Sequence, residues 1–224
     1  MNWLLFPVYI TNEIWLLFRN RIYYKGPLNP PKSWKTGYKG DVILIHGLNG
    51  RWVSLKKIGD AARELGFKVH IIKALGYNLK SIPEGAADIS EYIKKNNLKN
   101  VTLIGHSKGA LNAIYVLKDP EIDQIVRKVI IIAGPLKGLF LSRFTPTAGE
   151  LDSESDFMKQ YKKGIDSKKI VNIYPSVDDM VIPNASLQWE EVMNMKIDIY
   201  GHIRVVEADE TIKEIVSILN SLPS

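Results

Sequence analysis

The feature that most constrains the fold is a regular alternation of short apolar runs with segments of helical periodicity. Strands are predicted at the apolar runs 41–45, 68–72, 100–104, 128–133, 169–174 and 196–200. Helices are predicted at 54–65, 83–95, 107–117, around 186–193 and at 210–222, where apolar residues recur at helical spacing. Nearly continuous apolar strands belong to a sheet covered on both faces. The sequence therefore predicts an α/β fold with a mostly parallel central sheet and helices on both faces.

The length and composition fit a single domain with a substantial core. The chain has 224 residues, of which 46% are hydrophobic and 24% charged, as in ordinary globular proteins. The main domain is predicted to span 41–224, after an apolar N-terminal segment and a Pro- and Gly-rich lead-in that together cover 1–40. The alternation breaks at about 134–168, and an insertion of this length is predicted to act as a cap or substrate-binding flap.

The charge and the cysteine content exclude several classes of site. The net charge is +6, but the lysines are scattered as doublets that suit solvated surfaces, and no nucleic-acid-binding motif accompanies them. We therefore expect no nucleic-acid partner. The absence of cysteine excludes disulfides, thiol nucleophiles and thiolate metal sites. The sequence does not predict an oligomeric state.

Residues 1–18 form an unusually apolar segment, rich in Trp, Leu, Phe and Ile. Asn12 and Glu13 interrupt it, so it is too short for a spanning helix, and it lacks the basic start and cleavage site of a signal peptide. We expect it to pack on the domain or on a partner subunit, with peripheral membrane contact as the alternative. A cytoplasmic or peripheral membrane location is favoured over secretion.

A candidate nucleophile lies between a predicted strand and a predicted helix. Gly105, His106, Ser107, Lys108 and Gly109 fit the pattern G-x-S-x-G. A sharp turn from strand to helix needs glycines at both outer positions, because side chains there would collide, and the turn exposes the serine hydroxyl. The pattern in this context predicts Ser107 as a nucleophile.

A serine nucleophile needs a base, and histidine is scarce in this chain. His70 lies within a predicted strand, His106 adjoins the nucleophile, and His46 belongs to a separate glycine-rich turn. His202 remains, directly after the last predicted strand, where the base belongs in the order serine, acid, histidine. We therefore predict His202 as the general base.

Two adjacent aspartates are candidates for the acid that orients this histidine. Asp178 and Asp179 both follow the predicted strand 169–174, and either could instead form a turn or cap a helix that begins near Asn184. The residues alone leave the choice between them open.

Backbone donors for a developing oxyanion are expected at two turns. The sequence His46-Gly47-Leu48-Asn49-Gly50 follows the first predicted strand, where a flexible glycine backbone can direct an amide into the site. The backbone N–H groups of Leu48 and Lys108 are the predicted oxyanion donors. No metal and no organic cofactor is expected, because the histidines lack metal-ligand spacing.

From Asp41 to Val205 the chain resembles bacterial lipases and esterases of the α/β-hydrolase superfamily, the small triacylglycerol lipases and inositol-deacylase-like hydrolases among them. In such lipases an Asp followed by any residue, two aliphatic residues and often Pro marks the acid, so the resemblance favours Asp179 and implies the triad Ser107, Asp179 and His202. Lys108 departs from the family, and a cation at the pocket rim is expected to favour polar or anionic parts of a substrate. The motifs that carry the resemblance are IHGLNG, IGHSKGALNA, IAGPLKG, IYPSVDDMVIP and YGHIRVV.

These features together predict a serine hydrolase that cleaves carboxylic esters, a carboxylesterase or lipase, through an acyl-enzyme. The expected substrate is a small-molecule or lipid ester. The alternatives are a membrane-associated lipid deacylase or thioesterase and, in a different class, a non-catalytic lipid-binding or scaffold protein with the same fold.

Overall fold

The computed structural model describes residues 29–139, 142 and 149–223, and they form an α/β structure around one parallel sheet. The strand order is β2-β1-β3-β4-β5-β6, and every neighbouring pair is parallel. The strands are β1 (Asp41–Ile45), β2 (Lys68–Ile71), β3 (Val101–His106), β4 (Val126–Ile132), β5 (Ile170–Val177) and β6 (Met193–Tyr200). The predicted fold class is confirmed.

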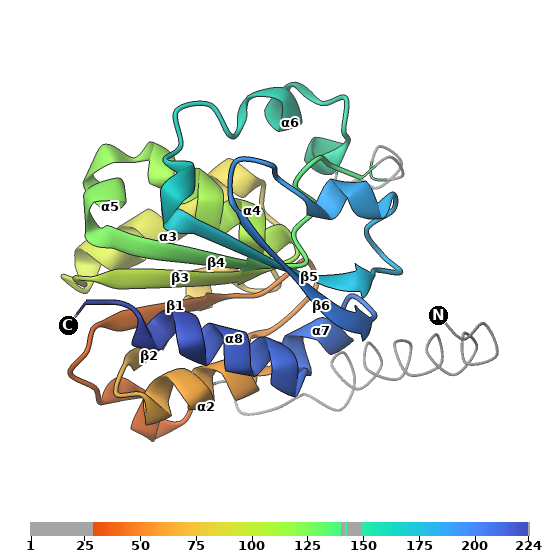
Figure 1. Ribbon diagram of the computed structural model, residues 1–224. Helices are drawn as coiled ribbons and strands as arrows, with labels where there is room; N and C mark the ends of the chain where they lie inside the picture. The colour runs from red at the N-terminus through yellow and green to blue at the C-terminus, as the bar shows by residue number, and fades with distance from the viewer. Residues whose placement is uncertain (1–28, 140–141, 143–148, 224) are drawn as a thin grey trace.

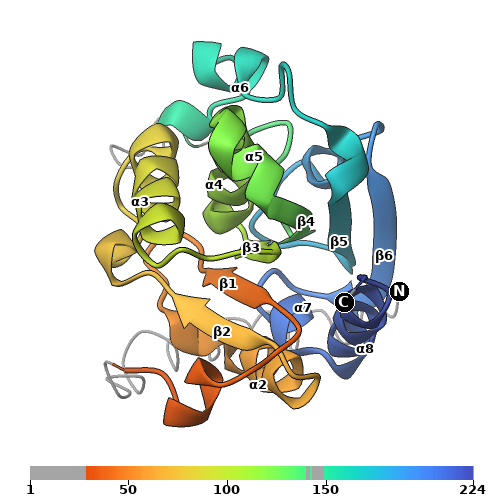
Figure 2. The same cartoon turned by 90° about the vertical axis from the view of Figure 1, so that its left-hand side faces the viewer.

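Helices cover both faces of the sheet, as Figures 1 and 2 show. One face carries α3 (Ile82–Lys95), α4 (Lys108–Tyr115), α5 (Pro120–Ile125) and α6 (Asp156–Gln160), and the other carries α2 (Lys56–Glu64), α7 (Arg204–Glu207) and α8 (Asp209–Asn220).

Strand β1 shows why apolar runs form this sheet. All its side chains are buried, with Ile43 and Ile45 in the core beneath α3 and α4 and Val42 and Leu44 in the core beneath α2 and α8. Successive side chains of a strand point to opposite faces, so a strand with apolar residues at every position serves two cores at once.

The predicted helix around 186–193 is wrong. The structure has a short 3-10 helix at Asn184–Leu187, and β6 already begins at Met193. The side chain of Asn194 explains the difference, because its amide donates to the backbone oxygens of Trp189 and Val192 at 2.7 and 2.9 Å. These bonds hold an irregular loop in place of a helix and bring Met193 into pairing with β5.

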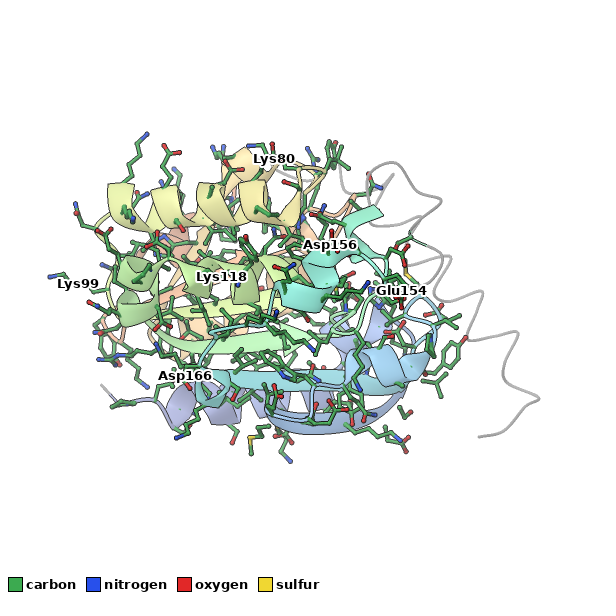
Figure 3. All side chains as sticks on the ribbon, turned by 90° about the horizontal axis from the view of Figure 1, so that it is seen from above. Lys80, Lys99, Lys118, Glu154, Asp156 and Asp166 are labelled. Carbon is green, nitrogen blue, oxygen red and sulfur yellow. The ribbon has the colours of Figure 1, made fainter. Side chains whose placement is uncertain are left out.

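The described part of the insertion between β4 and β5 lies over the face that carries α3 and α4. Its described part contains two 3-10 helices, Gly149–Leu151 and Ser167–Lys169, and α6 between them. Figure 3 places Lys99 and Asp166, which precede β3 and β5, toward one end of the molecule and Glu154 of the insertion toward the other. The insertion therefore extends to the edge where the parallel strands end.

The predictions for residues 1–18 lie outside the described residues. Within the described ranges, no helix combines the length and apolar character needed to cross a membrane.

Candidate active site

The turn at Ser107 has the sharp geometry that the sequence predicts. Ser107 adopts φ 56° and ψ −125°, a backbone conformation that residues with a side chain rarely take. A Cβ at Gly105 would lie 2.4 Å from the backbone oxygen of Gly109, and a Cβ at Gly109 would lie 2.3 Å from that of Ile45. Glycine is required at both positions, because any side chain there would overlap the backbone as the chain reverses from β3 into α4.

The Ser107 side chain lies against the glycine turn that follows β1. A Cβ built on Gly47 would approach the Ser107 Cβ to 2.8 Å and its Oγ to 3.3 Å, so only glycine leaves room for this hydroxyl. The Ser107 backbone N–H donates to the Ile132 oxygen at the end of β4, at 3.0 Å. The hydroxyl is thus held at the carboxyl ends of neighbouring strands, where open α/β sheets bind their ligands.

His202 and Asp178 form a buried pair at the same edge of the sheet. The Nδ1 of His202 lies 2.8 Å from Oδ2 of Asp178, and their side chains are only 2% and 0% exposed. A carboxylate can only accept, so Nδ1 carries the hydrogen. Nε2 then has the lone pair that can take up a proton, which is the tautomer a general base needs.

The Asp178 carboxylate is held in its orientation by the turn that follows it. Its Oδ1 accepts the backbone N–H groups of Met180 and Val181 at 2.9 and 2.8 Å. Burial would raise the pKa of Asp178, but the charge of His202 and its hydrogen bond, together with these two amides, outweigh burial and hold the pKa below its ordinary value. The carboxylate therefore stays ionised beside the imidazole.

The structure does not place Asp179 where the resemblance put it. Its Oδ1 accepts the backbone N–H of His202 at 3.0 Å, whereas the imidazole of His202 contacts Asp178. The expectation that Asp179 orients the imidazole is wrong. The reason lies in the turn, where the side chain of Asn184 accepts the Asp178 N–H at 3.0 Å and donates to the Asp178 oxygen at 2.7 Å. These bonds set the direction in which each aspartate points.

His106 connects the turn at Ser107 to His202. Its Nε2 donates to the backbone oxygen of His202 at 3.1 Å, and the two imidazole centroids are 4.8 Å apart. Complete burial, and next the charge of His202, lower the pKa of His106 to about 3. His106 is thus a neutral hydrogen-bond donor that fastens the backbone of His202 beside the Ser107 turn.

The predicted oxyanion donors, the backbone amides of Leu48 and Lys108, lie on the turns that follow β1 and β3. Lys108 is the first residue of α4, so its N–H has no acceptor within the helix. Within the described part of the chain, the N–H of Leu48 donates to no backbone oxygen. The turn that carries Leu48 is held from behind by Asn78, which donates to the His46 oxygen at 2.7 Å. Both turns lie at the edge of the sheet where the parallel strands β1 and β3 end.

The side chain of Lys108 points away from solvent, and the expectation of a cation at the pocket rim is wrong. The side chain is 0% exposed, and its ammonium lies 3.1 Å from Oε1 of Glu150 and donates to the Lys80 backbone oxygen at 2.6 Å. Burial of a charge is costly unless it is paired and hydrogen-bonded, and here it is both.

Sequence reasoning missed the roles of His106, Asn184 and Glu150. A signal existed for Glu150, because a lysine at the start of an otherwise apolar helix needs a carboxylate partner when it is buried. No local pattern identified which carboxylate that was. Among the described residues, no group of three or more His, Asp or Glu side chains is arranged to hold a metal ion.

Comparison with known proteins identifies the fold. No protein-family model matches the chain. The mature form of Bacillus licheniformis lipase BlEst2 is similar, with a TM-score of 0.62 and 16% identity over 86% of this chain and 95% of that one. A predicted CIB-like hydrolase from Thermoplasma acidophilum has a TM-score of 0.59 and 19% identity over 82% and 87%. Est1E from Butyrivibrio proteoclasticus has a TM-score of 0.56 and 14% identity over 88% and 89%.

At such low identity the likeness shows the fold alone. The predicted superfamily fold is thereby confirmed: the chain has the α/β-hydrolase fold, a parallel sheet with helices on both faces.

Proposed function

We propose that this chain is a serine hydrolase that cleaves carboxylic esters through an acyl-enzyme. Ser107 is the nucleophile, His202 the general base and Asp178 the acid that orients it. The observation that carries the proposal is the buried contact of 2.8 Å between His202 Nδ1 and Asp178 Oδ2, which His106 joins to the Ser107 turn. Such an acid and base beside a strained serine turn are the parts that acyl transfer by serine requires.

The reaction is proposed to follow from the roles of these groups. His202 Nε2 takes the proton of the Ser107 hydroxyl as its oxygen attacks the ester carbonyl, and Asp178 stabilises the resulting imidazolium. The imidazolium then gives the proton to the departing alcohol, which leaves an acyl group on Ser107. Water, activated by the same imidazole, releases the acid and restores the serine.

The negative charge that develops on the carbonyl oxygen is assigned to the backbone N–H groups of Leu48 and Lys108. Donors held in position by the fold stabilise the transition state without reorganisation. Loss of one such donor costs on the order of 3 kcal/mol of activation free energy in enzymes of this kind.

Exposed apolar side chains favour a substrate with an apolar part. Tyr77 and Leu79, 51% and 46% exposed, lie on the loop between β2 and α3, and Met180 and Ile182, 48% and 61% exposed, lie on the loop after β5. Both loops begin at the carboxyl ends of strands, on the same edge as Ser107. The neighbours of known structure include a lipase and a pair of lipolytic enzymes, which agrees with an ester of this kind.

The test is hydrolysis of a series of p-nitrophenyl esters of increasing acyl length, together with covalent labelling by a fluorophosphonate. The wild type should hydrolyse the esters and take the label, and Ser107→Ala should do neither. A wild type that neither takes the label nor hydrolyses an ester between pH 6 and 9 would refute the proposal and favour a non-catalytic role.

The two aspartates supply a matched pair of variants. Asp178→Asn removes the charge beside the imidazole and favours the wrong tautomer, so kcat should fall about 10⁴-fold, as for the corresponding change in serine proteases. Asp179→Asn changes a neighbour that, within the described part of the chain, bonds only to the backbone N–H of His202, and kcat should fall by about tenfold or less. A larger loss in Asp179→Asn would reverse the assignment of the acid.

A further inference from the structure

Lys108 is a completely buried cation directly beside the proposed nucleophile. Its side chain extends from the first turn of α4 to the backbone oxygen of Lys80, 2.6 Å away, and to the carboxylate of Glu150, 3.1 Å away. Lys80 lies just before α3, and Glu150 lies in the insertion between β4 and β5. One side chain therefore ties the nucleophile turn to two elements that come from distant parts of the sequence.

Besides its ion pair with Lys108, Glu150 accepts a hydrogen bond from the backbone at the start of α3. Both its carboxylate oxygens lie 2.9 Å from the backbone nitrogen of Ile82, the first residue of α3. The amino-terminal end of this helix carries a partial positive charge, which adds to the charge of Lys108 and stabilises the carboxylate. Glu150 therefore links the insertion to the first residues of both α3 and α4.

A series of hydrogen bonds continues from the start of α3 to the loop that carries Leu48, the second proposed oxyanion donor. Asn112 of α4 donates to the Ile82 oxygen at 3.1 Å and accepts from Asn78 at 3.0 Å. Asn78 donates in turn to the His46 oxygen at 2.7 Å, two residues before Leu48. The donors at Lys108 and at Leu48 are thus supported by one buried polar network.

The placement of this network suits a role in the reaction. The backbone N–H of Lys108 is a proposed oxyanion donor, and the side chain of the same residue is held at its far end by the fold. Movement of the N–H away from the oxyanion would require the ammonium of Lys108, which is completely buried, to leave the carboxylate of Glu150, which is 18% exposed.

We propose that Lys108 and Glu150 form a buried clamp that fixes the oxyanion donor of Lys108 against α3 and the insertion. Both are positioning residues for the ester hydrolysis proposed above, on which this inference rests. The charge of Lys108 serves the geometry of the turn and does not contact the substrate.

The test compares Glu150→Gln, Lys108→Met and the double variant. Glu150→Gln leaves the buried ammonium of Lys108 without its carboxylate, and Lys108→Met leaves the partly buried carboxylate of Glu150 without its cation, so both Tm and kcat should fall in each single variant. The double variant removes both charges together, a change that buried ion pairs often tolerate, so its Tm should return near that of the wild type. Its kcat should nevertheless stay on the order of tenfold below the wild type with KM within about threefold, because the lost contact acts in the transition state.

A matched control is the pair of Lys169 and Asp123, 2.7 Å apart and partly buried at the opposite end of the strands. Asp123→Asn should lower Tm and leave kcat within about twofold of the wild type. This control separates the loss of an ion pair from the loss of the clamp.

A second readout reports on the oxyanion position alone. A trifluoromethyl ketone adds to the serine and places a negatively charged oxygen on the two amides, so its inhibition constant should rise about tenfold in the double variant. A double variant with wild-type kcat and wild-type ketone affinity overturns the clamp. If the clamp alone is wrong, the wild type still hydrolyses esters. If the proposed function is wrong, the wild type itself shows no hydrolysis.

Discussion

Protonation of His106 should make the stability of this protein depend on pH in a defined window. Its pKa in the folded protein is about 3, against 6.5 for an exposed histidine, because the ring is buried beside His202. Between about pH 3 and 6.5 the unfolded chain therefore binds a proton at His106 that the folded protein does not. Protons thus favour the unfolded state, and stability falls as the pH falls through this window.

The size of the effect follows from the pKa difference. At pH 4.5, two units below the unfolded pKa, the proton bound by the unfolded chain costs the fold about 3 kcal/mol, at about 1.4 kcal/mol per unit. His106→Asn removes this contribution. The variant should be about 1 kcal/mol less stable than the wild type at pH 8, because its hydrogen bond to His202 is weaker. Between pH 8 and pH 4.5, however, its stability should fall by about 3 kcal/mol less than that of the wild type.

The assay is urea denaturation of both proteins at pH 8 and pH 4.5. Other groups that titrate in this range, including the buried His46, are present in both proteins and cancel in the comparison. Ser107→Ala is the matched control, because it changes the same turn and keeps the imidazole, so its pH dependence should equal that of the wild type. If His106→Asn lost as much stability as the wild type between the two pH values, the assignment of a neutral, desolvated His106 would be refuted.

Three further variants test the local geometry. Gly109→Ala places a methyl group 2.3 Å from a backbone oxygen at the end of β1, so it should destabilise the fold by about 1–3 kcal/mol, measured by urea denaturation, and abolish fluorophosphonate labelling. Ser81→Ala removes the N-cap of α3 and should cost about 1 kcal/mol, seen as a lower Tm, with no change in KM. Asn184→Ala frees the turn that aims Asp178 and should lower kcat about tenfold at unchanged KM, in ester hydrolysis assays. An unchanged free energy of unfolding in Gly109→Ala, an unchanged Tm in Ser81→Ala or an unchanged kcat in Asn184→Ala would contradict these expectations.

The strands were predictable because their apolar runs report burial on both faces. The structure extends β5 to Val177 and begins β6 at Met193, beyond the predicted runs, because backbone pairing continues through polar residues such as Asn194. The incorrect prediction of a helix around 186–193 also arises because a polar residue, Asn194, decides the local structure. Its apolar residues have helical spacing, but the loop is held by contacts of Asn194 that local periodicity does not report.

Candidate site residues could be predicted from the sequence where their place relative to a strand or a turn marks them. Glycines mark the turn at Ser107, and the end of the last strand marks His202. The choice between Asp178 and Asp179 could not be made from the sequence, because adjacent side chains point in different directions and the turn decides which one meets the imidazole. That turn depends on Asn184, a residue that no spacing rule indicates. Glu150 likewise contacts Lys108 only through tertiary packing.

The position of His202 and Asp178 in the sequence also determines at what stage of synthesis the chain could carry out the proposed hydrolysis. The turn at Leu48 and the nucleophile turn are made first, and Glu150 follows. The proposed acid and base come last, directly after the strands β5 and β6 that complete one edge of the sheet. A chain grows from its N-terminus, so a partly synthesised molecule has Ser107 and the proposed oxyanion donors but neither the proposed base nor the proposed acid. The proposed hydrolysis therefore begins only when the final strand has joined the sheet.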